Sequence, residues 1–227
     1  IVYLDSLGTV DATGKRSFAM LGYDDTFSIQ YFSSNRRGYW ANNGRTNITS
    51  RFSDLYNNYD DIMQQCRNTD RIIYKDGYEI GGQKYAEILA SVYRQTNAAH
   101  KLFTDSKGNL MYMSRENNSG GFINTLDVTY PSQPLYWLYS PALAKAMITP
   151  VFEYSALGKW NYDFPNHDLG HYPKANGNHY GNPADGSGST MPVEQSGNML
   201  TLAAIIAKLD GDLDYLRKYL PYMTKWA

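Results

Sequence analysis

A long segment rich in glycine, proline and asparagine, residues 160–198, is the feature that most constrains the fold. It contains three of the four histidines of the chain, His167, His171 and His179. The density of turn-forming residues excludes a long helix or strand, but aromatic residues such as Trp160 supply apolar surface that a flexible linker lacks. We therefore predict a packed loop that a rigid scaffold holds in place and that carries function.

The scaffold around this loop is predicted to be helical. Apolar residues recur at spacings of three and four over 50–77 and again over 83–104, with Gly81 and Gly82 between the two runs. This spacing and the glycine break are typical of a helical hairpin. His100 lies beside the apolar side of the second run and is predicted to be buried and hydrogen-bonded.

Prolines indicate where several further helices begin. Proline is favoured in a first helical turn, and three prolines are placed to open helices: Pro131, Pro141 and Pro192. The helix over 192–209 has little polar surface and ends before Gly211, so we expect it to be an inner, nearly enclosed helix. A last helix is predicted to begin near Asp212.

Shorter segments favour strands. Runs rich in β-branched and aromatic residues lie near the N-terminus, at 1–4, 17–21 and 26–32. Two further runs, 110–114 and 122–130, are joined by the asparagine and glycine turn 117–121, which predicts a β-hairpin inserted between helices. Asp127 falls late in the second of these two runs.

Together these elements predict a mainly α fold, a partial (α/α) toroid of helical hairpins with a β-rich N-terminal extension and an inserted β-hairpin. We place the extension at residues 1–48, as the end of an upstream β domain. The helical toroid domain is placed at 49–227 and is expected to be truncated at its C-terminus. In such a ring the long connections, including 160–198, line one mouth.

Composition excludes several classes of partner. The net charge of −1 gives no electrostatic reason to expect binding to nucleic acid or to an anionic membrane. No run of about 18 apolar residues is present, so no membrane span is predicted. Cys66 is the single cysteine, which excludes an internal disulfide. It lies on an apolar helical stripe and is interpreted as a small buried hydrophobic residue.

Several motifs resemble the signature of the glutaminase A family. Within and after the loop these are HDLGHYP at 167–173, ANG at 175–177 and MPVEQSGNML at 191–200. Other motifs that agree are GYDD at 22–25, SIQYF at 28–32, GQKYA at 82–86, LDVTYPS at 126–132 and LPYMTKW at 220–226. The resemblance extends over nearly the whole chain.

The resemblance implies a secreted or cell-envelope hydrolase that releases ammonia from glutamine. It also implies a β-rich domain followed by an (α/α) toroid, of which this chain would hold the end of the first and roughly the first half of the second. Open apolar helix faces would then pack against the remainder of the parent chain or against another copy. The expected partner is a small-molecule substrate, glutamine or a sugar-like polar ligand, and no cofactor is expected.

Amide hydrolysis requires a nucleophile or activated water, a proton donor for the leaving nitrogen and donors for the developing oxyanion. Three carboxylates are candidate catalytic groups: Asp127, Asp168 and Glu194. Each also has a structural alternative. Asp127 has the position of an acid that bonds nearby backbone, and Asp168 that of an acceptor for a glycine-rich turn. Glu194 either serves as a base, nucleophile or cation ligand or only complements the positive end of its helix.

Polar and aromatic side chains near these acids are candidate substrate-binding groups: His167, His171, Tyr172, Asn176, Gln195 and Asn198. His167 and His171 have the spacing of a helical metal pair, but Gly170 and Pro173 oppose a helix, so no metal site is predicted. We expect His171 to transfer protons or form hydrogen bonds instead. The run 185–188 resembles a calcium or phosphate loop only loosely and is interpreted as a flexible loop.

Two other functions remain open from the sequence. A glycoside hydrolase-like toroid enzyme would also use several carboxylates and an aromatic loop, and it would need two acids about 5 to 10 Å apart. A non-catalytic surface binding module is favoured if backbone and arginine partners fully occupy the carboxylates of the loop.

Overall fold

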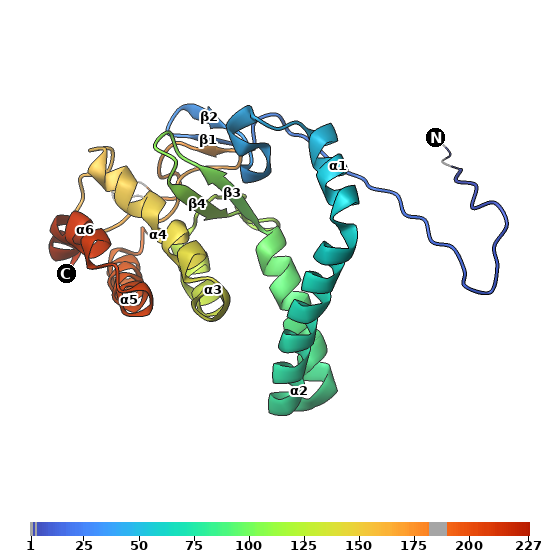
Figure 1. The fold of residues 1–227 in the computed structure, drawn as a ribbon. Coiled ribbons are helices and arrows are strands. Elements are labelled where there is room, and N and C mark those ends of the chain that lie inside the picture. The colour runs from blue at the N-terminus through green and yellow to red at the C-terminus, as the bar shows by residue number, and fades with distance from the viewer. Residues whose placement is uncertain (1, 3, 182–189) are drawn as a thin grey trace.

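The chain folds mainly into helices, with two small sheets (Figure 1). The computed structural model describes residues 2, 4–181 and 190–227. The elements in order are β1 (Ile29–Tyr31), β2 (Ser34–Arg36), the 3-10 helix η1 (Tyr39–Gly44), α1 (Ile48–Asn57), α2 (Tyr59–Ala98), β3 (His100–Thr104), β4 (Leu110–Ser114), α3 (Leu126–Tyr139), α4 (Pro141–Ala156), β5 (Lys174–Ala175), α5 (Pro192–Asp210) and α6 (Leu213–Trp226). The predicted mainly α class is confirmed. None of these helices is long and apolar enough to cross a membrane.

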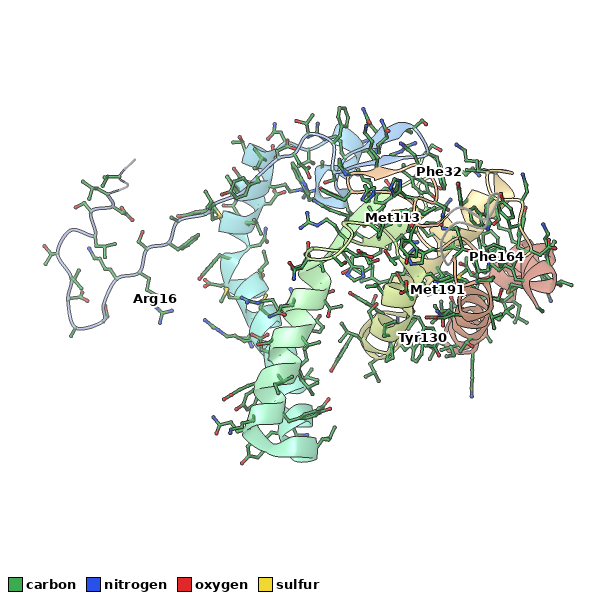
Figure 2. All side chains as sticks on the ribbon, turned by 180° about the vertical axis from the view of Figure 1, so that it is seen from behind. Arg16, Phe32, Met113, Tyr130, Phe164 and Met191 are labelled. Atoms are coloured by element: carbon green, nitrogen blue, oxygen red, sulfur yellow. The ribbon has the colours of Figure 1, made fainter. Side chains whose placement is uncertain are left out.

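An extended arm precedes the first strand. Residues 4–27 contain no helix or strand, and nearly all of their side chains are exposed. Figure 1 shows the arm leading away from the body, and Figure 2 places Arg16 on it, apart from the helices. The strand predicted at 17–21 is therefore wrong, because no described segment runs alongside it to share hydrogen bonds. The strand predicted at 1–4 lies partly outside the described residues.

The N-terminal sheet ties the long loop to the start of the fold. β1 pairs antiparallel with β2 and parallel with β5, which belongs to the loop, so that Tyr31 lies opposite Ala175. The Phe32 backbone N–H also donates to the Ala175 carbonyl at 3.0 Å. Of the strand predicted at 26–32, only residues 29–31 form. The loop is packed, as predicted, because it supplies an edge strand to this sheet.

The predicted N-terminal helical hairpin is present. α2 turns back on itself at Gly82, whose φ of 75° and ψ of −169° are not helical, and Figure 1 shows its two limbs projecting together from the body. The second limb ends at Ala98 rather than near 104. Cys66 lies on the first limb and is exposed, so the prediction that it is buried is wrong. Its face of the projecting limb has no packing partner among the described elements.

The predicted β-hairpin across the turn 117–121 forms only at its closed end, where Arg115 bridges Ile123 and the Asn124 N–H donates to the Ser114 carbonyl at 2.9 Å. Along its full length β4 pairs instead with β3, in a hairpin that was not predicted. The turn between the strands is fixed by Asp105, whose Oδ1 accepts the backbone N–H groups of Lys107 and Asn109 at 2.8 Å each. This pattern is an Asx-type turn. Residues 100–104 are therefore a strand rather than the end of a helix.

Asp127 lies in a helix rather than in a strand. α3 begins at Leu126, ahead of Pro131, so Pro131 stands inside the helix and does not open it. Proline lacks the N–H that would donate to the carbonyl four residues earlier, which in this helix is that of Asp127. Because α3 begins at Leu126, Asp127 lies in its first turn, where the helix dipole favours a negative charge.

The C-terminal helices begin and end where the sequence predicts. Pro141 and Pro192 open α4 and α5, Gly211 follows α5 with a φ of 70°, and the Asp212 side chain caps α6. α5 is buried on one side only, with Val193 86% exposed, so the prediction of a nearly enclosed helix is wrong. The enclosed helix is α4, which packs against β4, α3, α5 and α6 together.

Two apolar clusters form the interior. One fills the space between the helices α3 to α6, and the other joins β1, β3 and β4 to the loop through residues such as Met113 and Leu169. In Figure 2, Phe32 and Met113 mark the sheet layer and Tyr130 marks α3. The loop thus lies between a sheet layer and a helical layer, and both restrain it.

His100 is half-buried at the start of β3. Its Nδ1 lies 2.6 Å from the Thr96 carbonyl oxygen and therefore carries a proton, and its Nε2 is buried without a partner among the described residues. Burial lowers the pKa of His100 from its ordinary value of 6.5, and the hydrogen bond to Thr96 opposes this shift without reversing it. The predicted hydrogen-bonded histidine is confirmed.

The free energy of unfolding is expected to fall as the pH drops below about 6.5. In the unfolded chain His100 binds a proton at its ordinary pKa, whereas in the folded chain it stays neutral until a lower pH. The unfolded state thus binds more protons in this interval, and stability is lost toward the folded pKa. Urea unfolding at about pH 7.5 and about pH 5.5 measures this loss, which should be smaller for His100→Gln. Equal losses in both proteins would contradict the prediction.

Candidate functional site

The candidate site is built on two segments that run antiparallel to each other. One leads into α3 and the other is the first part of the loop. The Ile123 N–H donates to the Gly170 carbonyl at 2.8 Å, the Leu169 N–H returns to the Ile123 carbonyl at 2.9 Å, and the Leu126 N–H donates to the His167 carbonyl at 2.8 Å. This pairing brings the first turn of α3 beside residues 167–168.

The imidazole of His167 lies between two carboxylates. Its Nδ1 is 3.0 Å from Oδ2 of Asp168, and its Nε2 is 3.4 Å from Oδ1 of Asp127. The three side chains differ in their exposure, which is 31% for Asp127, 6% for His167 and 0% for Asp168. The three groups thus form a row that leads from the surface at Asp127 into the interior at Asp168.

Asp168 is saturated with hydrogen-bond donors. Its Oδ1 accepts the backbone N–H groups of Gly170 at 2.7 Å and His179 at 3.0 Å, and its Oδ2 accepts that of Tyr180 at 2.9 Å. Both oxygens of Asp168 thus act as hydrogen-bond acceptors, as those of a carboxylate do. The contact with His167 therefore requires that Nδ1 carries a proton and donates it to Asp168.

The proton on Nδ1 determines how His167 interacts with Asp127. With its proton on Nδ1, a neutral imidazole presents the lone pair of Nε2 to Asp127 Oδ1, and a lone pair repels a carboxylate oxygen. A proton between the two atoms removes this repulsion, whether it rests on Nε2 or on Oδ1. No hydrogen bond to Asp127 Oδ1 is formed among the described residues. Nε2 of His167 and Oδ1 of Asp127 thus face each other at 3.4 Å, as two groups that share a proton would.

Aromatic rings surround this row. Phe122 contacts the rings of His171 at a centroid distance of 4.7 Å and of Tyr180 at 5.8 Å, and the ring of His179 lies 4.1 Å from that of His171. Tyr180 also contacts His167 at 4.6 Å. Neither Phe122 nor Tyr180 was predicted as a site residue, although aromatic residues in a glycine-rich loop are a signal of packing.

The remaining predicted site residues lie elsewhere. Tyr172 packs beneath the Arg115 guanidinium, 4.8 Å from its ring centroid. Asn176 anchors the loop to the β1–β2 turn, because its Oδ1 accepts the Ser33 N–H at 2.7 Å and its Nδ2 donates to Gln30 at 2.6 Å. Its amide is thus fully engaged in holding the loop.

Three predicted residues belong to the first turns of α5. Glu194 is exposed and forms no ion pair with the described residues, those of the row at His167 included. Gln195 is fully buried, and its Oε1 accepts the Asn198 amide at 3.4 Å. The structure therefore brings Asp127, His167 and Asp168 into direct contact, and the role of Glu194 stays a prediction.

The described residues contain no group of three or more histidine, cysteine, aspartate or glutamate side chains arranged to hold a metal ion. His167 and His171 are not on a helix, since residues 161–173 form turns and isolated bridges. The run 185–188, interpreted from the sequence as a flexible loop, lies outside the described residues.

Comparison with known proteins identifies the ancestry of the chain. Residues 82–227 match the family model of the glutaminase A six helical-hairpin domain. The chain belongs to the glutaminase A family. Residues 3–76 match a domain model of unknown function, DUF5127. The predicted division at residues 48 and 49 stays a prediction.

Two curated relatives are named as glutaminases. Glutaminase A of Aspergillus oryzae is 31% identical over 180 residues, which cover 79% of this chain and 25% of that protein. A protein of Arthroderma benhamiae named as a probable glutaminase is 31% identical over 133 residues, which cover 58% of this chain and 15% of that protein. The chain thus spans a quarter or less of the length of these relatives. No solved structure matches the chain.

Proposed function

We propose that this member of the glutaminase A family belongs to an amidohydrolase that releases ammonia from glutamine, with Asp127 as the group that faces the substrate. The observation that carries the proposal is the row in which Asp127 is partly exposed, His167 nearly buried and Asp168 fully buried. A substrate can reach only the first of these groups. The other two control its charge and its proton.

The proton-sharing pair fits the needs of amide hydrolysis. Asp127 accepts a proton from water while the water oxygen bonds to the amide carbon, and His167 compensates the charge of the carboxylate. Asp127 then returns the proton to the leaving nitrogen as the carbon–nitrogen bond breaks. The products are glutamate and ammonia, and the pair regains its starting protonation. Asp127 thus serves first as a base, when it takes the proton from water, and then as an acid, when it gives that proton to the leaving nitrogen.

The two other functions are less well supported by these contacts. A glycosidase needs two carboxylates that reach the substrate, but Asp168 is fully buried and saturated by backbone N–H groups. A purely structural module would be expected to satisfy both acids of the row, yet the buried Oδ1 of Asp127 has no hydrogen bond among the described residues. The Asp127 side chain is 31% exposed, so Asp127 is the acid of the row that a substrate can reach.

The proposal is tested with the natural protein and a small set of substrates. Ammonia release is measured with glutamine and asparagine, and sugar release with a panel of aryl glycosides of glucose, galactose and mannose. We expect ammonia from glutamine and no sugar from any glycoside. Release of sugar without release of ammonia would support the glycosidase alternative. Failure to release either product would overturn the proposed activity.

A further inference from the structure

A single asparagine, Asn178, connects the two arms of the loop that hold His167. Its Oδ1 accepts the backbone N–H of His167 at 2.9 Å and that of Asp168 at 3.3 Å. Its Nδ2 donates to the carbonyl oxygens of Tyr180 at 3.0 Å and Gly181 at 3.3 Å. All hydrogen-bonding atoms of the amide are thus used within the loop, so the side chain acts as a clamp between residues 167–168 and 180–181.

The two residues that follow Asn178 in the chain also bind Asp168. The backbone N–H groups of His179 and Tyr180 are two of the three that donate to the Asp168 carboxylate. Asn178 therefore fixes the carboxylate from both sides, through the peptide units that carry Asp168 and through the N–H groups that bind it. The orientation of His167 depends on this arrangement, since its Nδ1 donates to the same carboxylate.

The clamp is itself fixed to the helical layer. The backbone N–H of Asn178 donates to the Tyr154 hydroxyl at 3.2 Å, and Tyr154 belongs to the enclosed helix α4. Gly177 lets the chain pass this hydroxyl closely, because a Cβ at this position would lie 2.6 Å from the Tyr154 oxygen. The contacts thus run from α4 through Asn178 to the imidazole.

We infer that Asn178 is a positioning residue that keeps Nδ1 of His167 protonated and directed at Asp168, and so keeps Nε2 facing Asp127. The inference deepens the proposed function and rests on it for its catalytic consequence. The proton position itself is a property of the folded protein and can be measured without substrate. Asn178 does not touch the substrate, and its effect is carried entirely by Asp168 and His167.

The experiment compares Asn178→Ala with Asn161→Ala. Asn161 lies in the same loop, but its amide bonds only to the Gly158 carbonyl, so it is a matched control. Nitrogen-15 NMR of the imidazoles distinguishes the nitrogen that carries the proton. We expect Nδ1 of His167 to carry a proton in the wild type and in Asn161→Ala, and to lack it in a measurable fraction of the molecules in Asn178→Ala. Activity on glutamine should show kcat lowered by about 10- to 100-fold, with KM little changed.

A second variant keeps the test decisive if Asn178→Ala fails to fold. Tyr154→Phe removes only the hydroxyl that accepts the Asn178 N–H, and it should lower the fraction of His167 with a proton on Nδ1 in the same way but less. Unchanged imidazole signals in a folded Asn178→Ala protein, or in Tyr154→Phe where that variant alone folds, would overturn the inference, even if kcat fell. If the wild type has no activity on glutamine, the proposed function fails, but the imidazole signals still decide the role of Asn178.

Discussion

Replacing Asp127 by asparagine is expected to lower kcat for ammonia release from glutamine by about 10²- to 10⁴-fold, the usual contribution of a positioned acid or base. The amide has nearly the same size as the carboxylate, so packing at the first turn of α3 is kept. It cannot accept a proton from water or return one to the leaving nitrogen. The loss should therefore appear mainly in kcat, which a coupled assay for ammonia measures.

The control for this prediction is Asp214→Asn. Asp214 also lies in the first turn of a helix, α6, and is 88% exposed. Its substitution reproduces the lost interaction with a helix dipole, which is worth a few tenths to about 1 kcal/mol, without touching the row at His167. We expect its kcat to equal that of the wild type. An Asp127→Asn protein that keeps its activity would show that Asp127 does not perform the chemistry.

Helices at the C-terminal end of the chain could be predicted because local chemistry determines their ends. Proline fits the first turns of α4 and α5 since it lacks an N–H that would be unsatisfied there. Gly211 adopts the left-handed conformation that ends α5, and Asp212 caps the helix that comes after it. These signals act within a few residues, so they can be recognised without knowledge of the tertiary fold.

The strand pairing could not be predicted in the same way, because it depends on distant partners. Residues 100–104 continue a helical spacing of apolar residues, but they become β3 because β4 lies alongside. The sequence does contain one signal for this hairpin, since the turn-forming residues Asp105 and Gly108 lie between the two strands. Residues 122–126 look like a strand and do pair in an extended form, with the end of β4 and the residues after it on one side and with the loop segment 167–172 on the other.

The members of the candidate site could be identified from the sequence, but their arrangement could not. Asp127, His167 and Asp168 were all recognised as candidates from their types and surroundings. Their order from surface to interior depends on the pairing of two segments far apart in the chain, and no periodicity reports such a pairing. Glu194 had equal chemical merit but lies on an exposed turn of α5. Asn178 was missed, since an asparagine in a glycine-rich loop usually indicates only a turn.

Replacing Asp168 by asparagine is expected to lower the free energy of unfolding by about 2 to 5 kcal/mol. The carboxylate of Asp168 accepts four hydrogen bonds, two on each oxygen, at full burial. An amide presents one oxygen and one NH2 group, so in either orientation two of the four donors face another donor. A buried donor left unpaired costs about 1 to 3 kcal/mol. Urea unfolding followed by tryptophan fluorescence measures the change.

The same substitution at Asp163 separates this effect from a general weakening of the loop. Asp163 is 80% exposed and pairs with Lys225 at 3.0 Å, an exposed contact that should be worth less than about 1 kcal/mol. A similar loss of stability in both variants, or no loss in Asp168→Asn, would contradict the described saturation of Asp168.

With Asp168→Asn the imidazole of His167 also loses the fixed acceptor that holds its proton on Nδ1. Ammonia release should then fall even under conditions in which the variant remains folded, because Asp127 no longer faces an oriented Nε2.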